Sequence, residues 1–234
     1  MLQFFVYLLK LDEEFMIQRL KTTHRLNFSI LLLLMTAFSV SLSIVRAKMT
    51  DSNIFLFLNW NLFLAMIPWL ISSAVILKNL NTKGILVILI VIWLLFFPNS
   101  PYILTDLFHL KKRAPVPMWF DLVLLLSFAW TGLLYGLNSL KDIEELLKKH
   151  IHTKYVYSLS TLFLFMSAFG IFIGRYLRWN SWDIISNPLA LFNDIIVRLT
   201  DPLSYPNTWG MTILMGILLN MMHLSFKFIR SSRI

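Results

Sequence analysis

Two short polar stretches carry the residue types that could perform chemistry. The first covers residues 98–110 and reads PNSPYILTDLFHL. Asp106 and His109 stand about one helical turn apart in it, so the carboxylate could accept a hydrogen bond from the imidazole and raise its basicity. The pair could then act as a general acid and base. An equally open alternative is a helix that begins at a Ser100 cap and lies along a membrane surface, its polar face simply meeting water.

The second stretch covers residues 174–183 and reads GRYLRWNSWD. On a helix, Arg175, Arg178 and Trp182 would share one face. The planar guanidinium group suits phosphate or carboxylate, and tryptophan faces suit sugar rings, lipid headgroups or cations. Anchoring of a span by arginine and tryptophan at the membrane surface is the alternative. The density of polar residues favours binding over plain anchoring.

Other polar residues are expected near the same membrane face. Asp121 stands at the outer start of a predicted span, where an acid needs a partner or complements the helix dipole. Arg175 and Arg178 are the cations expected to pair with the nearby acids. Asn59 and Asn61 lie in another span and could either join the site or tie helices together. The candidate catalytic residues are Asp106 and His109; the candidate binding residues are Asn99, Tyr102, Asp121, Arg175, Arg178, Trp179, Asn180, Trp182 and Asp183.

Composition places all of these residues in a membrane protein. Of the 234 residues, 58% are hydrophobic and 14% are charged, against roughly 45–50% and about 25% in soluble domains. The absence of cysteine excludes disulfides and thiolate chemistry within this sequence. The net charge of +9 comes from basic residues that flank apolar runs. This distribution indicates anionic lipid headgroups as partners and argues against nucleic acid.

Six apolar segments are long enough to cross a bilayer as helices. They cover residues 26–45, 54–77, 84–98, 119–140, 155–174 and 208–229. The predicted fold is an all-α, polytopic membrane helix bundle with six transmembrane helices and two amphipathic surface helices on one face. The surface helices are expected at residues 100–110 and 188–199, the second with Asp194 and Arg198 one turn apart. Residues 26–234 form a single membrane domain.

Residues 1–25 are assigned as an N-terminal tail. Its first 15 residues are either an interfacial helix or an addition upstream of a start at Met16, and the sequence does not separate the two. Of the 21 lysines and arginines, 13 fall on the side of the termini and 8 on the opposite side. The excess predicts a plasma-membrane protein with both termini in the cytoplasm.

The remaining signals point to structure. The 141–154 link is expected to be a charged loop whose Glu144–Lys148 and Glu145–Lys149 pairs lie on a solvated helix. Asn220 and His223 are expected to form an interhelical hydrogen bond. Two Gly-x-x-x-Gly motifs, at 132–136 and 170–174, predict close helix packing. Familiar hydrolase, zinc-protease and nucleotide-binding motifs are absent from the sequence. No cofactor and no metal site are predicted.

The two polar stretches together resemble a family of bacterial multi-pass membrane proteins that is known only as a domain of unknown function. The resemblance runs from about the first span to the C-terminus and rests on Pro98 to Leu107 and Gly174 to Asp183. It implies a place in the membrane and carries no activity.

Two hypotheses about function follow. In the first, the protein is an enzyme or binder that acts on an envelope phospholipid, polyprenyl-phosphate or glycolipid, with Asp106 and His109 for acid–base chemistry and the arginines for phosphate. In the second, it is a non-catalytic component, either a partner of another membrane protein or a small-solute permease.

Overall fold

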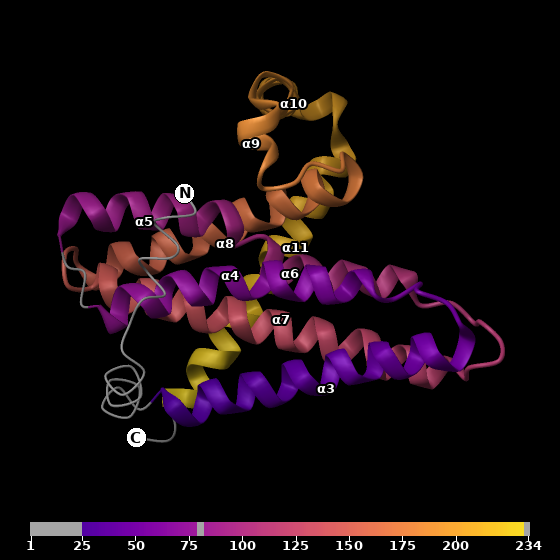
Figure 1. The fold of residues 1–234 in the computed structure, drawn as a ribbon. Coiled ribbons are helices and arrows are strands. Elements are labelled where there is room, and N and C mark those ends of the chain that lie inside the picture. The colour runs from indigo at the N-terminus through magenta and orange to yellow at the C-terminus, as the bar shows by residue number, and fades with distance from the viewer. Residues whose placement is uncertain (1–24, 79–81, 232–234) are drawn as a thin grey trace.

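The structure is a computed structural model that describes residues 25–78 and 82–231 (Figure 1). The expectations for residues 1–15 lie outside the described residues. The regular structure in the described part of the chain is helical, with α-helices and two short 3-10 helices, and one isolated bridge joins Arg113 and Val116. The all-α class is therefore confirmed.

Six helical segments are long and apolar enough to cross a membrane, as predicted. Five of them are single α-helices: α3 (Leu26–Thr50), α4 (Phe57–Leu77), α7 (Met118–Leu147), α8 (Thr153–Tyr176) and α11 (Pro206–Ser231). The sixth is composite. Its helix α5 (Lys83–Phe96) has 14 residues, or about 21 Å of rise against a hydrocarbon core of about 30 Å. The short helices α6 (Asn99–Tyr102) and η1 (Ile103–His109) continue the crossing.

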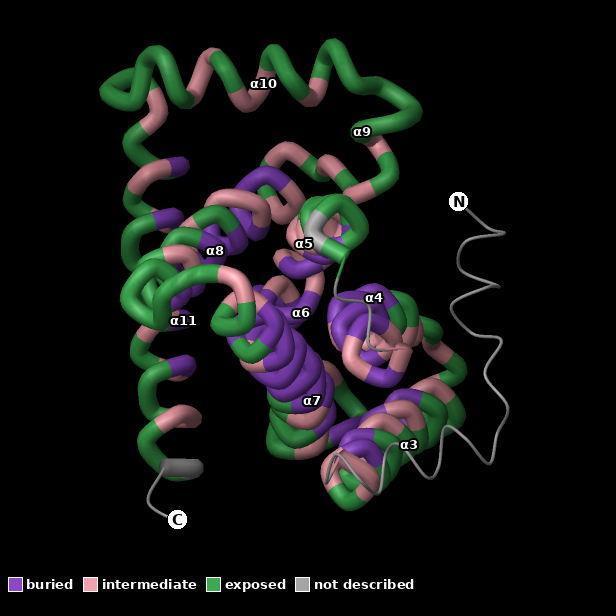
Figure 2. Tube along the Cα trace, turned by 90° about the vertical axis from the view of Figure 1, so that its left-hand side faces the viewer, coloured by how far each residue is buried: buried purple, intermediate pink, exposed green. Residues whose placement is uncertain are grey.

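Helix α7 forms the centre of the bundle. It packs against α3, α4, α8 and the α6–η1 segment, and Figure 2 shows it as the most continuously buried helix. The outward faces of α3 and α11 expose apolar side chains such as Leu34 and Leu214. In a membrane protein these faces meet lipid. Helix α11 packs mainly on α8 and runs steeply across the other spans (Figures 1 and 2).

The segment after Pro98 is helical as expected, but it is buried between helices and does not lie along the surface. Ser100 is not a helix cap; its hydroxyl donates a 2.7 Å hydrogen bond to the Ala65 carbonyl of α4. Ile103 and Asp106 are buried as well. The segment enters the bundle because Ser100 fits against Gly136 of α7 and Pro98 fits against Gly170 of α8.

The two Gly-x-x-x-Gly motifs provide this space from two sides. A Cβ at Gly136 of α7 would stand 2.8 Å from the Ser100 Cβ, and a Cβ at Gly170 of α8 would stand 2.9 Å from the Pro98 Cγ. Real Cβ atoms do not approach so closely, so these positions need glycine. The motifs serve packing, as predicted, and both of them contact the same third segment.

The second long connection contains α9 (Asp183–Ser186), α10 (Pro188–Thr200) and η2 (Pro202–Ser204). The predicted amphipathic helix is α10, and its Arg198–Asp194 pair forms at 3.3 Å. Helix α10 appears end-on in Figure 1, where α3, α4 and α7 lie lengthwise, and lengthwise in Figure 2, where they appear end-on. It therefore lies across the bundle direction, the orientation expected of a membrane-surface helix.

The prediction that the helical turns after residue 140 are solvated is wrong. Helix α7 continues to Leu147 because Ile143 and Leu146 extend its apolar face into the core. Asp142 and Glu144 are buried with it. Asp142 pairs with Arg25 at 2.7 Å, and Glu144 hydrogen-bonds His223 at 2.9 Å. The exposed i,i+4 pair on this turn is Lys141–Glu145, in place of the two pairs expected.

Candidate functional site

A buried ion pair joins the two polar stretches of the sequence. Arg175, at the end of α8, donates to the Asp106 Oδ1 of η1 at 3.1 Å, and Asn61 of α4 donates to Oδ2 at 2.9 Å. The Asp106 side chain is 1% exposed. Each carboxylate oxygen thus has a donor, as a buried charge requires. The two remote stretches meet at one end of the bundle, as expected.

Arg175 also separates the proposed acid–base pair. Its second terminal nitrogen lies 3.3 Å from His109 Nε2. The guanidinium therefore bridges Asp106 and His109, and it takes the place of the direct Asp106–His109 hydrogen bond that the sequence spacing suggested. Because guanidinium only donates, His109 Nε2 must accept, which places the ring proton of a neutral imidazole on Nδ1. The Tyr102 and Phe108 rings lie 5.9 and 5.5 Å from the guanidinium carbon.

The other two acids have partners that differ from those expected. Asp121 accepts hydrogen bonds of 2.6 and 3.3 Å from Arg46 of α3, and the two side chains are 0% and 3% exposed. The cation expected there was Arg175 or Arg178, but Arg175 is engaged by Asp106 and His109, and Arg178 is exposed.

Asp183 is held within its own turn. It accepts from the backbone N–H of Asn180 at 2.7 Å and from the Ser186 hydroxyl at 3.0 Å. The backbone hydrogen bond is the main reason that the pKa of Asp183 lies below its usual value. No arginine was needed to hold this carboxylate.

The expected common face of Arg175, Arg178 and Trp182 does not form. Helix α8 ends at Tyr176, and Arg178 has a left-handed backbone with φ of 62°. Helical spacing therefore stops applying, and Arg178 is exposed. Trp182 instead packs edge-on against Trp60, with ring centroids 6.4 Å apart.

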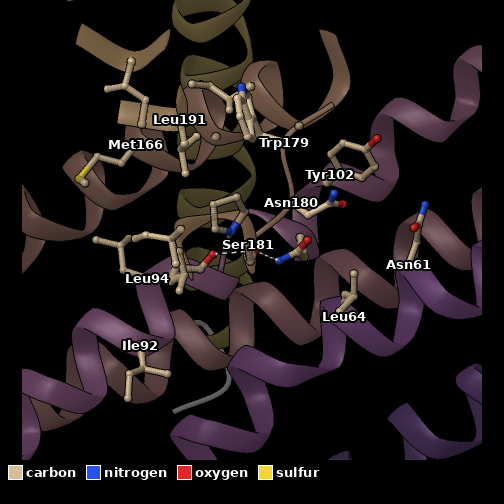
Figure 3. A pocket seen from close by; sticks show the side chains of 18 of the residues that line it. Asn61, Leu64, Ile92, Leu94, Tyr102, Met166, Trp179, Asn180, Ser181 and Leu191 are labelled. Atoms are coloured by element: carbon tan, nitrogen blue, oxygen red, sulfur yellow. Dashed lines mark hydrogen bonds between the residues drawn. The ribbon is translucent and has the colours of Figure 1, made fainter. Parts of the chain in front are cut away.

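A cavity of about 500 Å³ opens beside the ion pair, between α4, α5, α8 and the 179–195 segment (Figure 3). Its two ends differ in chemistry. Tyr102, Asn180 and Asn61 gather at one end, and aliphatic side chains such as Leu94 and Met166 line the other. Four candidate binding residues line the cavity: Asn99, Tyr102, Trp179 and Asn180. The remaining candidates lie outside its lining: Asp106, His109, Asp121, Arg175, Arg178, Trp182 and Asp183.

The polar end of the cavity is fixed by hydrogen bonds. Asn99 donates through Nδ2 to the Phe96 carbonyl at 2.9 Å and to the Ser181 hydroxyl at 3.0 Å, and Ser181 donates to the Leu95 carbonyl. Trp179 is anchored through Nε1 to Asp194 of α10 at 2.7 Å. Residues 179–181 are therefore tied to α5 and to the surface helix α10.

The amide orientations decide what this end of the cavity can bind. Carboxylate and carbonyl oxygens only accept, so the NH₂ groups of Asn61 and Asn99 must face Asp106 and Phe96. Their amide oxygens are left as acceptors. The Arg175 charge is already matched by Asp106, so this end is neutral and rich in acceptors.

Sequence reasoning missed two kinds of residue. Arg46 and Arg25 pair with buried acids, although their positions beside the first span suggested only flanking charges. The signal that could have revealed these pairs was the set of acids in α7 that had no cation nearby in the sequence. The aliphatic wall of the cavity gave no signal, because its residues look like any other lipid-facing or core positions. Among the described residues, no group of three or more His, Asp or Glu is placed to hold a metal ion.

The six apolar spans and their buried polar groups define a multi-pass membrane protein. A family model described as "Protein of unknown function (DUF1361)" matches residues 60–222, which include every residue of the cavity lining. The chain belongs to this family, as the two polar stretches indicated. No curated protein matches the chain, and no solved structure matches it.

Proposed function

We propose that this protein binds an amphiphilic membrane lipid whose headgroup carries hydroxyl groups, as in a glycolipid. The supporting observation is the cavity itself, which is open, about 500 Å³ in volume, aliphatic at one end and polar at the other. Ligand pockets commonly have this form, with apolar walls and a few placed polar groups. An acyl or isoprenoid chain would occupy the aliphatic end and the headgroup the end near Asn61.

The acceptor-rich polar end favours a sugar or glycerol headgroup over a phosphate. The amide oxygens of Asn61 and Asn99 can accept from hydroxyl groups, whereas a phosphate would need donors and positive charge. Arg175 is paired with Asp106, and neither Arg175 nor Arg178 lines the cavity. We therefore assign Arg175 and Asp106 a positioning role: they hold Asn61 and Tyr102 at the cavity wall.

This assignment also favours binding over catalysis. Asp106 is buried with both oxygens engaged, and His109 Nε2 faces Arg175. A general acid or base must reach the substrate proton directly or through one water. Neither Asp106 nor His109 lines the cavity, so an enzymatic role in the proposed complex would require η1 to move.

We further propose a plasma-membrane location with both termini in the cytoplasm, from the excess of basic residues on that side. The cavity then lies in the outer half of the bundle, because it is lined by the start of α4 and the ends of α5 and α8. The ligand would be a lipid of the outer leaflet. A partner membrane protein on the exposed α10 is the non-binding alternative.

The test compares two lipids with the same tails. Purified full-length protein in mild detergent is titrated with dioleoyl-glucosylglycerol and with dioleoylglycerol, and bound lipid is counted by native mass spectrometry. Leu94→Trp fills the cavity from α5, and Val87→Trp on the same helix is the matched control because Val87 is exposed and outside the lining. We expect binding of the glycolipid that is lost in Leu94→Trp and kept in Val87→Trp. Equal binding of the two lipids, or equal binding by the two variants, would contradict the proposal, and turnover of the glycolipid would restore the enzymatic hypothesis.

A further inference from the structure

A second cavity, of about 380 Å³, lies at the opposite end of the bundle from the first. It is formed where the end of α7 meets the start of α8 and the last turns of α11. Polar side chains line it: Glu144 and Ser160 are buried, Asn220 is half-buried and Thr161 is exposed at its mouth. Its outer part is lined by Leu224 and Phe228, which are 51% and 74% exposed on the lipid-facing side of α11. The cavity therefore combines a polar interior with an apolar edge.

The hydrogen bond between His223 and Glu144 sets the charge of this cavity. His223 Nε2 lies 2.9 Å from Glu144 Oε1, and its Nδ1 is buried without a hydrogen-bond partner among the described residues. A proton on Nδ1 would be a buried donor with nothing to bind, so we assign the ring proton to Nε2, which donates to the carboxylate. The histidine is then neutral and Glu144 carries the one negative charge.

Two lysines more than balance that charge. Lys227 Nζ is 3.9 Å from Glu144 Oε2, beyond hydrogen-bond distance, and sits 3.4 Å from the centre of the Tyr157 ring. Lys148 Nζ lies 5.5 Å from the centre of the same ring. Lys148 lies outside the cavity lining, but both ammonium groups flank the Tyr157 ring, so they outnumber the single Glu144 carboxylate and leave this edge of the cavity with a net positive charge. The Tyr157 ring holds the Lys227 ammonium in place. At 3.9 Å the Glu144 carboxylate does not accept a hydrogen bond from it, and no other described residue does.

We propose that this cavity binds the phosphodiester headgroup of an anionic phospholipid from the leaflet opposite to that of the first site. A phosphodiester carries one negative charge, which matches the surplus, and its oxygens accept hydrogen bonds from Lys227 and from the Thr161 hydroxyl. The acyl chains lie along Leu224 and Phe228. The first cavity differs because its cation is internally paired and its free groups are acceptors.

The experiment uses full-length protein in mild detergent with three probes: dioleoylphosphatidylglycerol, dioleoylglycerol and inorganic phosphate. Native mass spectrometry counts bound lipid, and a competition series adds phosphate to the phospholipid complex. Lys227→Gln removes the charge, with Lys149→Gln as the control because Lys149 is exposed at the same end and outside the lining. Thr161→Phe fills the cavity without changing charge, with Leu162→Phe as its neighbouring lipid-facing control.

We expect the phospholipid to bind, with an affinity about tenfold lower in Lys227→Gln, since one charge-assisted hydrogen bond is lost. Binding is lost in Thr161→Phe and kept in both controls. Leu94→Trp, which fills the first cavity, leaves this binding unchanged, so the two proposals fail independently.

Equal loss in Lys149→Gln, or equal binding of dioleoylglycerol, would overturn the proposal. Displacement of the phospholipid by phosphate at equal concentration would show a free-anion site and overturn the lipid assignment. Each variant is first checked for an unchanged melting temperature without added lipid.

Discussion

Arg175 and Asp106 are 69 positions apart in the chain, and their side chains meet at 3.1 Å inside the bundle. The contact fixes the end of α8 against η1. Through Asn61, which donates to the other Asp106 oxygen, it also fixes the start of α4. One buried carboxylate thus holds η1, α4 and α8 together, and α4 and α8 both line the first cavity.

Removal of only one member of this pair is expected to be strongly destabilising. Arg175→Gln leaves a buried carboxylate without its cation, which should lower the free energy of unfolding by about 3–5 kcal/mol. Asp106→Asn combined with Arg175→Gln should cost less than the sum of the two single changes, because no uncompensated charge stays buried. Titration with sodium dodecyl sulfate, followed by far-UV circular dichroism, measures both. Additive losses would show that the pair is not coupled.

The Arg46–Asp121 pair predicts a contrast between buried and exposed charges. Both of its side chains are almost fully buried, so Asp121→Asn should lower the free energy of unfolding by about 3–5 kcal/mol through the unpaired Arg46. Glu145→Gln removes the acid of an exposed pair in the same helix, where about 0–0.5 kcal/mol is expected. The same unfolding titration compares the two variants. Similar losses for both would mean that burial does not determine the effect.

These pairs also mark the limit of what the sequence can predict. Apolar run lengths predicted all six spans, and the i,i+4 spacing of Asp194 and Arg198 predicted their contact, because both signals are local. Arg46 and Asp121 are 75 positions apart. An arginine beside a span looks the same in sequence whether it meets lipid headgroups or a buried acid. Which one occurs depends on how the helices pack.

The same reason explains the position of residues 98–110. Their polar and apolar periodicity is that of a surface helix, and only the packing of Ser100 and Pro98 against glycines of α7 and α8 places them inside. Likewise, Asp142 and Glu144 sit in a charged sequence that is typical of a loop. Their burial follows from the continuation of α7 and from partners that are distant in the chain, namely Arg25 just before α3 and His223 on α11.

Membrane topology can be tested with single cysteines because the sequence contains none. Lys112→Cys and Ser186→Cys are placed at exposed positions in the two long connections, and Lys149→Cys at an exposed position after α7. A membrane-impermeant maleimide added to intact cells should label the first two and should reach the third only after permeabilisation. Labelling of Lys149→Cys alone would reverse the proposed orientation. Labelling of Lys112→Cys without Ser186→Cys would separate the two connections and contradict the shared face.

The glycine contacts predict opposite signs for similar substitutions. Gly136→Ala places a Cβ 2.8 Å from that of Ser100, so neighbouring segments must shift, at a cost of about 1–3 kcal/mol. Gly210→Ala in α11 meets nothing within 4 Å and should gain about 0.5–1 kcal/mol from the higher helix propensity of alanine. The free energy of unfolding measured by the detergent titration should therefore fall for Gly136→Ala and rise for Gly210→Ala.

Ser100→Gly removes the Cβ atom that Gly136→Ala would meet. The double variant should therefore lose less free energy of unfolding than the two single variants together. A purely additive result would show that the close contact between α6 and α7 does not set the requirement for glycine.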